Sequence, residues 1–169
     1  MVAGDIMNRK VVTVTRNTSL AVAARLMLDH GINGLPVLDE QGSVVGMVGI
    51  RDVLRVPKPS HSEMPILKWE RLEEKAAELT RTTVGQVMAR RVVSVNEDTS
   101  VIEVAAIMAN KGVHPIPVLR NGQLLGVIGR ADIVRVLLDL SEKTGNSATG
   151  DQGWLRSQCG VLSESNQAK

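Results

Sequence analysis

Two aspartates end stretches of sequence that are nearly identical. Asp52 ends the stretch Gly46-Met-Val-Gly-Ile-Arg-Asp52, and Asp132 ends Gly126-Val-Ile-Gly-Arg-Ala-Asp132. Each stretch predicts a strand that runs into a helix, so each carboxylate lies near a helix start. One interpretation is structural, an N-cap that accepts hydrogen bonds from helical amides. The other is ligand binding, because a carboxylate can accept both hydroxyl protons of a vicinal diol such as that of ribose.

The surroundings of the two aspartates extend the second interpretation to a nucleotide. Each helix start, with Arg51 in one stretch and Arg130 in the other, can hold phosphate. Apolar, β-branched side chains can form a slot for a flat base; the candidates are Val12, Ile32, Val93 and Val113. No nucleophile–base pair, twin carboxylate or Walker loop stands out in the sequence, which favours binding over catalysis.

Composition argues against several other classes of protein. The formal net charge is +2, and Phe and Tyr are absent, so neither a basic field nor stacking platforms for a nucleic acid polymer are expected. The single cysteine, Cys159, and three dispersed histidines give no metal-ligand spacing. No apolar run of about 18 residues occurs, and Met1 leads almost directly into the first repeat. We therefore expect no metal, no membrane span, no signal peptide and a cytoplasmic location.

The chain contains a tandem duplication that places one aspartate in each copy. Residues 5–56 align with residues 86–136 after a single deletion at a turn. Two copies with a period near 80 residues are too few and too long for a solenoid, so a pseudo-symmetric pair is expected. Identical pairs include Met7 and Met88, Val12 and Val93, Gly31 and Gly112, Pro36 and Pro117, Gly49 and Gly129, and Asp52 and Asp132.

Each copy predicts the element order β-α-β-β-α. In the first copy a strand over 11–14 precedes a helix that begins near Ser19 and stops at Gly31, and the second helix runs from Ser100 to Gly112. The strands at 35–38 and 116–119 contain a proline, which belongs at a strand start or edge. We expect the first two strands of each copy to be parallel and the last two to form an antiparallel hairpin.

The helices predicted at 19–30, 100–111 and 132–140 are apolar on more than one face. Such helices need cover on two sides, and Leu137, Leu138 and Leu140 are too many for a free surface. This pattern predicts a homodimer.

Between the copies, residues 57–65 are proline-rich and predict a linker, and residues 66–80 predict a helix. Trp69 on that helix is interpreted as a packing residue, with a ligand contact as the alternative. From Ser141 the composition turns polar, which is typical of a disordered or loosely docked tail.

With its duplicated β-α-β-β-α unit, its Gly-x-x-Gly-x-x-Asp ending and its Leu/Ile-Pro-Val-Leu strand, the chain resembles a tandem pair of CBS domains, known as a Bateman module. The resemblance covers residues 3–140. It implies an α/β fold in which two units form a pseudo-two-fold pair. The expected domains are 3–56 and 84–140, separated by the linker region 57–83 and followed by a tail over 141–169.

In that family each nucleotide lies in the cleft between the two units, and this implies two sites here. The first site combines Asp132, Gly129, Arg130 and Ala131 with Met7, Val12, Ile32 and Asn33. The second combines Asp52, Gly49 and Arg51 with Met88, Val93, Val113 and His114. The family's fuller motif carries Thr or Ser where Gly49 and Gly129 stand, so only the backbone amide remains for that contact. His114 falls where relatives often place a basic phosphate contact; the alternative is an exposed residue at the start of a strand.

The resemblance implies a stand-alone regulatory module without catalysis of its own. It would bind an adenosyl nucleotide such as AMP, ADP or ATP as a regulatory ligand, need no other cofactor, and signal to a regulated protein. The alternative is a CBS pair that acts by protein contact and has no physiological nucleotide.

Overall fold

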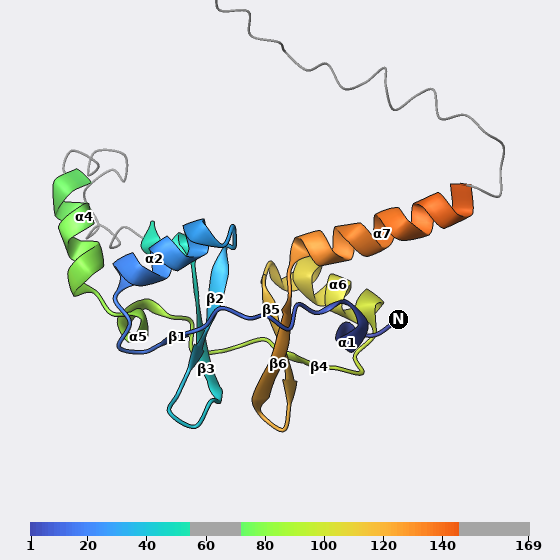
Figure 1. The fold of residues 1–169 in the computed structure, drawn as a ribbon, viewed down its shortest axis with the longest axis horizontal. Coiled ribbons are helices and arrows are strands. Elements are labelled where there is room, and N and C mark those ends of the chain that lie inside the picture. Colours follow the sequence, from blue (N-terminus) through green and yellow to red (C-terminus); the bar gives the residue numbers. More distant parts are fainter. Residues whose placement is uncertain (55–71, 146–169) are drawn as a thin grey trace, which may run out of the picture. The chain divides into compact units, whose positions relative to one another are not determined.

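Two three-stranded sheets, one from each repeat, form the framework of the protein (Figure 1). The computed structural model describes residues 1–54 and 72–145. Residues 1–133 form one compact unit that holds both sheets, and a second unit begins at Val134. The predicted α/β fold, a pair of β-α-β-β-α units, is confirmed.

The first repeat has the strand order β1-β2-β3. β1 is parallel to β2 and β2 is antiparallel to β3, as predicted. Its elements are α1 (Ala3–Ile6), β1 (Val14–Thr15), α2 (Leu20–Asp29), β2 (Gly34–Leu38), β3 (Val44–Gly49) and α3 (Ile50–Val53).

The second repeat follows the same order, β4-β5-β6, with the same strand directions. The hairpin between β5 and β6 turns through Asn121 and Gly122, both at positive φ, as its Asn-Gly sequence predicts. Its elements are α5 (Val84–Val87), β4 (Val95–Asn96), α6 (Val101–Lys111), β5 (Ile116–Arg120), β6 (Gln123–Ile128) and α7 (Arg130–Gly145).

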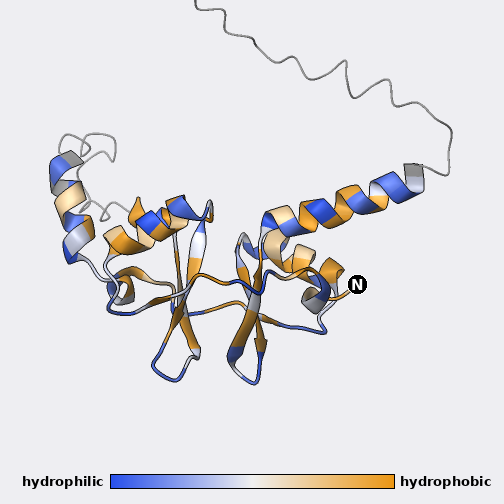
Figure 2. Cartoon of the chain, viewed as in Figure 1, coloured by the Kyte–Doolittle hydropathy of each residue, from blue (hydrophilic) through white to orange (hydrophobic). Residues whose placement is uncertain are grey.

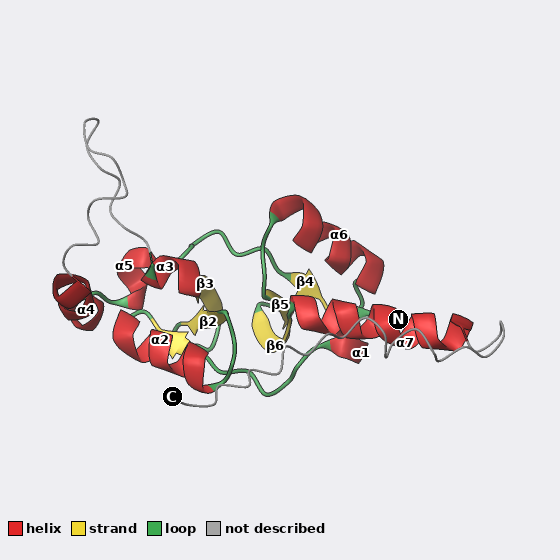
Figure 3. Cartoon of the chain, turned by 90° about the horizontal axis from the view of Figure 1, so that it is seen from above, coloured by secondary structure: helices red, strands yellow, loops and turns green. Residues whose placement is uncertain are grey.

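The first segment of each repeat packs on the sheet of the other repeat. Ala3 of α1 and Met7, which follows that helix, belong to the core of the second repeat, with Ile116 and Ile128. Val84 and Met88 belong to the core of the first repeat, with Leu35. Seen from above, α1 lies on the side of the second sheet and α5 on the side of the first (Figure 3). The two repeats therefore exchange their first helices.

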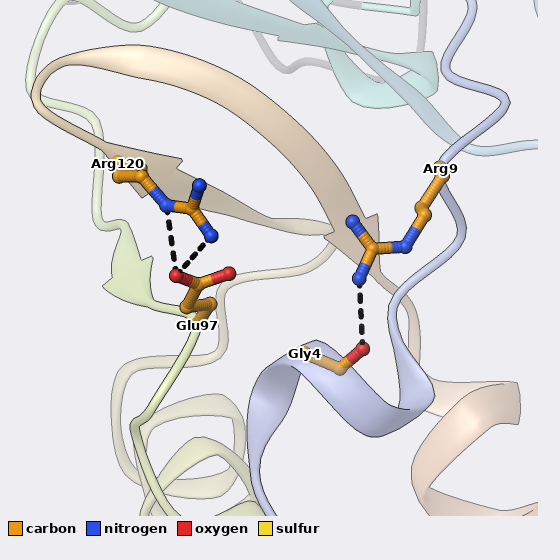
Figure 4. Close-up of polar contacts among 4 residues, drawn as sticks. All are labelled: Gly4, Arg9, Glu97 and Arg120. Atoms are coloured by element: carbon orange, nitrogen blue, oxygen red, sulfur yellow. Dashed lines mark hydrogen bonds and ion pairs between the residues drawn. The ribbon is translucent and has the colours of Figure 1, made fainter.

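Backbone hydrogen bonds fix this exchange. Asn8 and Val127 exchange N–H···O bonds of 2.8 and 3.0 Å, and Ala89 and Met47 make the matching pair at 2.8 and 3.0 Å. Gly4 N–H also donates to Glu97 O at 2.8 Å. Figure 4 shows the surroundings of this contact, where Arg9 donates to Gly4 O at 3.4 Å and Arg120 pairs with the Glu97 carboxylate.

The exchange explains why the strand predicted at 11–14 is shorter. Asn8 is still bonded to Val127 of the other repeat, so the chain must cross before it joins its own sheet. Only Val14 and Thr15 pair with β2. The expectation of a strand over 11–14 is wrong, because residues 9–13 span the gap between the two sheets.

The strand prolines also differ from expectation. Pro36 lies in the middle of β2, whereas Pro117 is the second residue of β5, and both are buried in the central strand of their sheet. β1 pairs with Val37 and Leu38, one residue beyond Pro36, and β4 pairs with Val118 and Leu119. Each proline therefore has a strand partner on one side only, so no hydrogen bond to a second strand is lost by the absence of its N–H.

The predicted caps of α2 and α6 are present. Ser19 Oγ accepts from Val22 N–H at 3.3 Å and Ser100 Oγ accepts from Glu103 N–H at 3.2 Å. Gly31 and Gly112 follow these helices with φ of 61° and 63°, the left-handed conformation that glycine tolerates.

The observed bounds of α4 and α7 differ from the predicted ones. α4 is described over Leu72–Arg81; residues 66–71, with Trp69, lie outside the described residues. α7 runs to Gly145, so the polar tail does not begin at Ser141. The Ser141 hydroxyl donates to Leu138 O at 2.8 Å and the Thr144 hydroxyl to Leu140 O at 2.9 Å, which keeps these polar side chains inside the helix.

Hydrophobic residues predominate in the strands of the first unit (Figure 2), and the strands and helices contribute the buried apolar residues of one core in each repeat. Large apolar side chains that are exposed occur on α2, α6 and α7; among them are Val22, Leu28, Ile102, Val134, Leu137, Leu138 and Leu140. Among residues 1–54 and 72–145, no helix has the length and apolar character that a membrane span requires.

Candidate functional site

Asp52 and Asp132 make the same hydrogen bond at the start of a helix. Gly49 N–H donates to Asp52 Oδ2 at 2.8 Å, and Gly129 N–H donates to Asp132 Oδ2 at 2.8 Å. The helices begin immediately after the two glycines, so each aspartate is the third helical residue. The predicted N-cap position is therefore wrong, although the carboxylates do accept from a backbone amide at the helix start.

The position of these carboxylates suits a diol ligand. A carboxylate has about four lone-pair positions, and one bond to a backbone amide does not saturate it. Both side chains are half-buried, which leaves one side of each turn accessible.

An arginine in the first turn of each helix, Arg51 and Arg130, acts on His114. Partial burial lowers the pKa of His114, and the positive charges of Arg130 and Arg51 lower it further. Arg51 belongs to the first repeat and Arg130 to the second, so His114 lies in the field of both helix starts. His114 is also half-buried. Two arginines and an imidazole N–H are groups that can bind an anion.

The start of β2 lies against the residue that precedes β5. A Cβ on Gly34 would approach Pro115 Cδ to 2.8 Å, closer than packed atoms allow. Glycine is therefore required at position 34 for the two repeats to meet. The contact brings the neighbouring residues Asn33 and His114 to the junction of the repeats.

Met7 and Met88 each lie on the sheet that carries the aspartate of the other repeat. Met7 packs over Gly126 of β6, where a Cβ would approach its sulfur to 2.7 Å. Met88 packs over Gly46 of β3, where the corresponding distance is 2.5 Å. Met7 thus packs on the repeat that carries Asp132 and Met88 on the repeat that carries Asp52, and the contact of either with a ligand stays a prediction.

The other predicted residues are placed differently. Val12 and Ile32 pack against the core of the first repeat, together with Ile50 of α3. Asn33 O accepts from Ile50 N–H at 3.0 Å, so its backbone belongs to the Asp52 turn. Val113 packs on the core of the second repeat, Val93 is half-buried and Ala131 is exposed. Their contact with a ligand stays a prediction.

A cavity of about 230 Å³ lies next to Asp52, and it is lined by residues that were not predicted to belong to a ligand site. Its lining comes from α2, α3, α4 and α5 and includes Leu20, Lys75, Glu78, Leu79, Thr82 and Gln86. Lys75, Glu78 and Leu79 share one face of α4, a spacing that was visible in the sequence, and Thr82 directly follows the helix. The sequence did not indicate that α4 lies beside Asp52.

A second cavity of about 410 Å³ lies at the hairpins of the two repeats. Arg9, Leu38 and Gln123 are among the residues that line it, and none of the predicted site residues does. No cluster of His, Cys, Asp and Glu suited to a metal ion occurs in the described part of the chain.

Comparison with known proteins identifies a family and several similar proteins. The family model described as "CBS domain" matches residues 3–58 and 84–139. A 17.7 kDa protein of Acidianus ambivalens is 31% identical over 137 residues, which cover 80% of this chain and 73% of that protein.

Two solved structures share the fold at similar identity. CBSX2, described as an Arabidopsis thaliana protein, was crystallised with AMP; it is 25% identical with a TM-score of 0.66, over 82% of this chain and 97% of that one. The CBS domain pair of protein MJ0100 was crystallised with 5′-methylthioadenosine and S-adenosyl-L-methionine. It is 26% identical with a TM-score of 0.65, over 83% of this chain and 98% of that one.

Proposed function

The chain belongs to the CBS-domain family, and we propose on that basis that it is a regulatory module that binds an adenosyl nucleotide and passes its occupancy to a partner protein. The observation that carries the proposal is the pair of aspartate turns, each with an arginine in the same helical turn, and His114 in the field of both arginines. The carboxylates can accept from ribose hydroxyls, the two arginines can bind phosphate, and His114 can donate a hydrogen bond to it. The AMP and S-adenosyl-L-methionine complexes of the two relatives support the same ligand class.

Thermal unfolding of the full chain tests this proposal. A ligand at 100 times its dissociation constant adds about 2.7 kcal/mol to the free energy of unfolding and raises the melting temperature by several degrees. We expect such a shift with AMP, ADP, ATP or S-adenosyl-L-methionine at millimolar concentration. A melting temperature that no compound changes would overturn the proposal and favour a CBS pair that acts by protein contact alone.

The two aspartates separate two sites. We expect Asp52→Ala and Asp132→Ala each to weaken one site about tenfold to a hundredfold, because charge-assisted hydrogen bonds contribute about 1.5 to 3 kcal/mol. In the assignment implied by the family, His114→Ala weakens the Asp52-dependent site although it lies in the other repeat. Titration calorimetry on the three variants decides this. Loss confined to the Asp132-dependent site would contradict the assignment.

We further propose that two copies pair through their helices. Val22 on α2 is 51% exposed and Ile102 on α6 is 83% exposed, and exposed apolar patches generally mark association. On α7, Leu137 and Leu138 are also more than half exposed. Light scattering at micromolar concentration should give twice the 18.2 kDa mass of the chain. The monomer mass would refute this pairing.

A further inference from the structure

The cavity of about 410 Å³ at the two hairpins, called the hairpin cavity from here on, is separate from the aspartate turns. It lies where β3 and β6 begin, beside Gly42 and Gln123, whereas the two turns follow the ends of these strands. Each strand has six residues, which span about 20 Å at about 3.3 Å per residue. In Figure 1 both hairpins lie at the end of the sheets away from α2.

The segment that crosses between the two sheets forms one wall of the hairpin cavity. Arg9, Val11 and Thr13 line the cavity, whereas Val12 packs against the core of the first repeat. Alternate residues of the segment thus face opposite sides, as they do in an extended chain. The crossing segment therefore supplies the cavity with a guanidinium group, a hydroxyl group and an apolar side chain.

The other walls come from the two hairpins, which are joined to each other. Ser43 and Gln123, at matched positions of the two repeats, form a β-bridge. Leu38 of β2 and Leu124 and Leu125 of β6 line the cavity, and Leu125 packs against the core of the second repeat. All of these residues belong to the same compact unit. The lining is therefore part of the packed fold.

Arg9 is available to a ligand in this cavity. Its guanidinium donates to Gly4 O at 3.4 Å (Figure 4), and one long bond to a neutral carbonyl does not occupy the five N–H donors of the group. No carboxylate occurs among the described residues that line the cavity. Asp39, in the first hairpin, accepts from Gln41 and Ser43 N–H of its own turn.

The apolar part of the lining is open to a ligand as well. Val11, Leu38, Leu124 and Leu125 are half-buried, so each keeps apolar surface that a ligand can cover. A volume of about 410 Å³ lies within the range of roughly 300 to 1,000 Å³ that is typical of sites for small molecules.

We propose that the hairpin cavity binds a monocarboxylate with an apolar body. The planar guanidinium of Arg9 can bind both carboxylate oxygens, and Thr13 and Gln123 can donate hydrogen bonds to the same group. The apolar body lies against the aliphatic side chains of the lining. A single guanidinium balances the one charge of a carboxylate, whereas a phosphate monoester carries a charge of about −1.5 to −2.

Calorimetric titration of the full chain with octanoate tests this site. We expect octanoate to bind at millimolar concentration, and Arg9→Ala to weaken it about tenfold or more because a charge-assisted pair is lost. Arg90→Ala is the matched control and should change nothing. Arg90 aligns with Arg9 and donates to Gly85 O at 3.5 Å, but it is not part of the lining. Octanol has the same apolar body without the charge and should bind about tenfold more weakly or less.

A second pair of variants makes the test independent of any structural role of Arg9. Gln123→Glu sets a carboxylate in the lining and should also weaken octanoate about tenfold. Asn121→Asp makes the same change of charge in the same hairpin but outside the lining, and should leave the affinity within about twofold.

Three results would each overturn the proposal while leaving the nucleotide function untouched. The first is no binding of octanoate at millimolar concentration. The second is equal affinity for octanoate and octanol, which would show that the carboxylate is not recognised. The third is an affinity that Gln123→Glu leaves unchanged, which would place the bound anion outside the hairpin cavity even if Arg9→Ala weakens it.

Discussion

At the turn that carries Asp52, Asn33 O accepts from Ile50 N–H at 3.0 Å, and a Cβ on Gly49 would lie 3.1 Å from that oxygen. At the turn that carries Asp132, the only described atom within 4 Å of a Cβ on Gly129 would be Asp132 Oδ2, at 3.5 Å. The first turn is closed from the side of β2 and the second is more open. Duplication has kept the hydrogen bond to each aspartate while the surroundings of the two turns have diverged.

The outer parts of the two repeats differ in their ion pairs. Glu97 and Arg120 form a salt bridge in the second repeat (Figure 4). The aligned residues in the first repeat, Arg16 and Asp39, carry the opposite charges. Asp39 there accepts from Ser43 N–H at 2.8 Å and from Gln41 N–H at 3.0 Å within its own hairpin. The same backbone therefore carries different polar interactions in the two repeats. Substitutions at matched positions measure how far the two repeats differ in stability.

The largest effect should come from the exchanged methionines. Met7 and Met88 are 8% and 6% exposed, each in the core of the other repeat. Replacing either by Ala removes buried apolar volume and should lower the free energy of unfolding by about 2 to 5 kcal/mol. Urea unfolding checks this, with Leu54→Ala, a 56% exposed residue, as control. A loss below about 1 kcal/mol in one repeat alone would show that the exchange is not energetically symmetric.

Serine at the two turn glycines tests the closed and the open turn directly. Gly49→Ser forces the Asn33 carbonyl to move and should cost about 1 kcal/mol or more of stability. Gly129→Ser meets only ordinary contact distances and should change stability by less than about 0.5 kcal/mol. Chemical denaturation of both variants gives the comparison. Equal costs would mean that the Asn33 carbonyl yields freely and that the two turns are mechanically alike.

The pH dependence of stability should report on His114. Burial and the two arginines hold its pKa below its ordinary value of 6.5, so just below that pH the unfolded chain binds more protons than the folded one. The free energy of unfolding should therefore rise with pH up to about 6.5, and His114→Gln should reduce this slope. Urea unfolding between pH 5.5 and 7.5 measures it, with exposed His30→Gln as control. If the slope is unchanged in His114→Gln, the arginines do not lower the pKa of His114.

The smallest effect should come from the Glu97–Arg120 pair. Arg120 is 58% exposed, and exposed ion pairs contribute about 0 to 1 kcal/mol. Arg120→Ala should lower stability within that range at low salt, and the difference should shrink in 1 M salt because the charges are screened. Arg16→Ala in the first repeat is the matched control. A loss of 2 kcal/mol or more would show that Arg120 also holds the α1 contact beside Glu97.

The sequence determined the repeated architecture because its signals are local. The serine caps, the glycine stops and the Asn-Gly turn each depend on a few neighbouring residues, and all lie where the sequence predicts them. The duplication then required the two copies to fold alike. The family and the pair of aspartates at helix starts could therefore be inferred from the order of the residues alone.

Tertiary structure alone decided which repeat each segment serves. Met7 and Met88 pack on the other repeat, and residues 9–13 cross between the sheets where a strand was expected. Lys75 and Glu78 belong to the helix predicted between the copies, yet they line the cavity beside Asp52. Hydrophobic periodicity tells which side of an element is buried, but burial is non-directional and does not name the partner. That choice depends on long-range packing, which in this chain puts the first helix of each repeat on the sheet of the other.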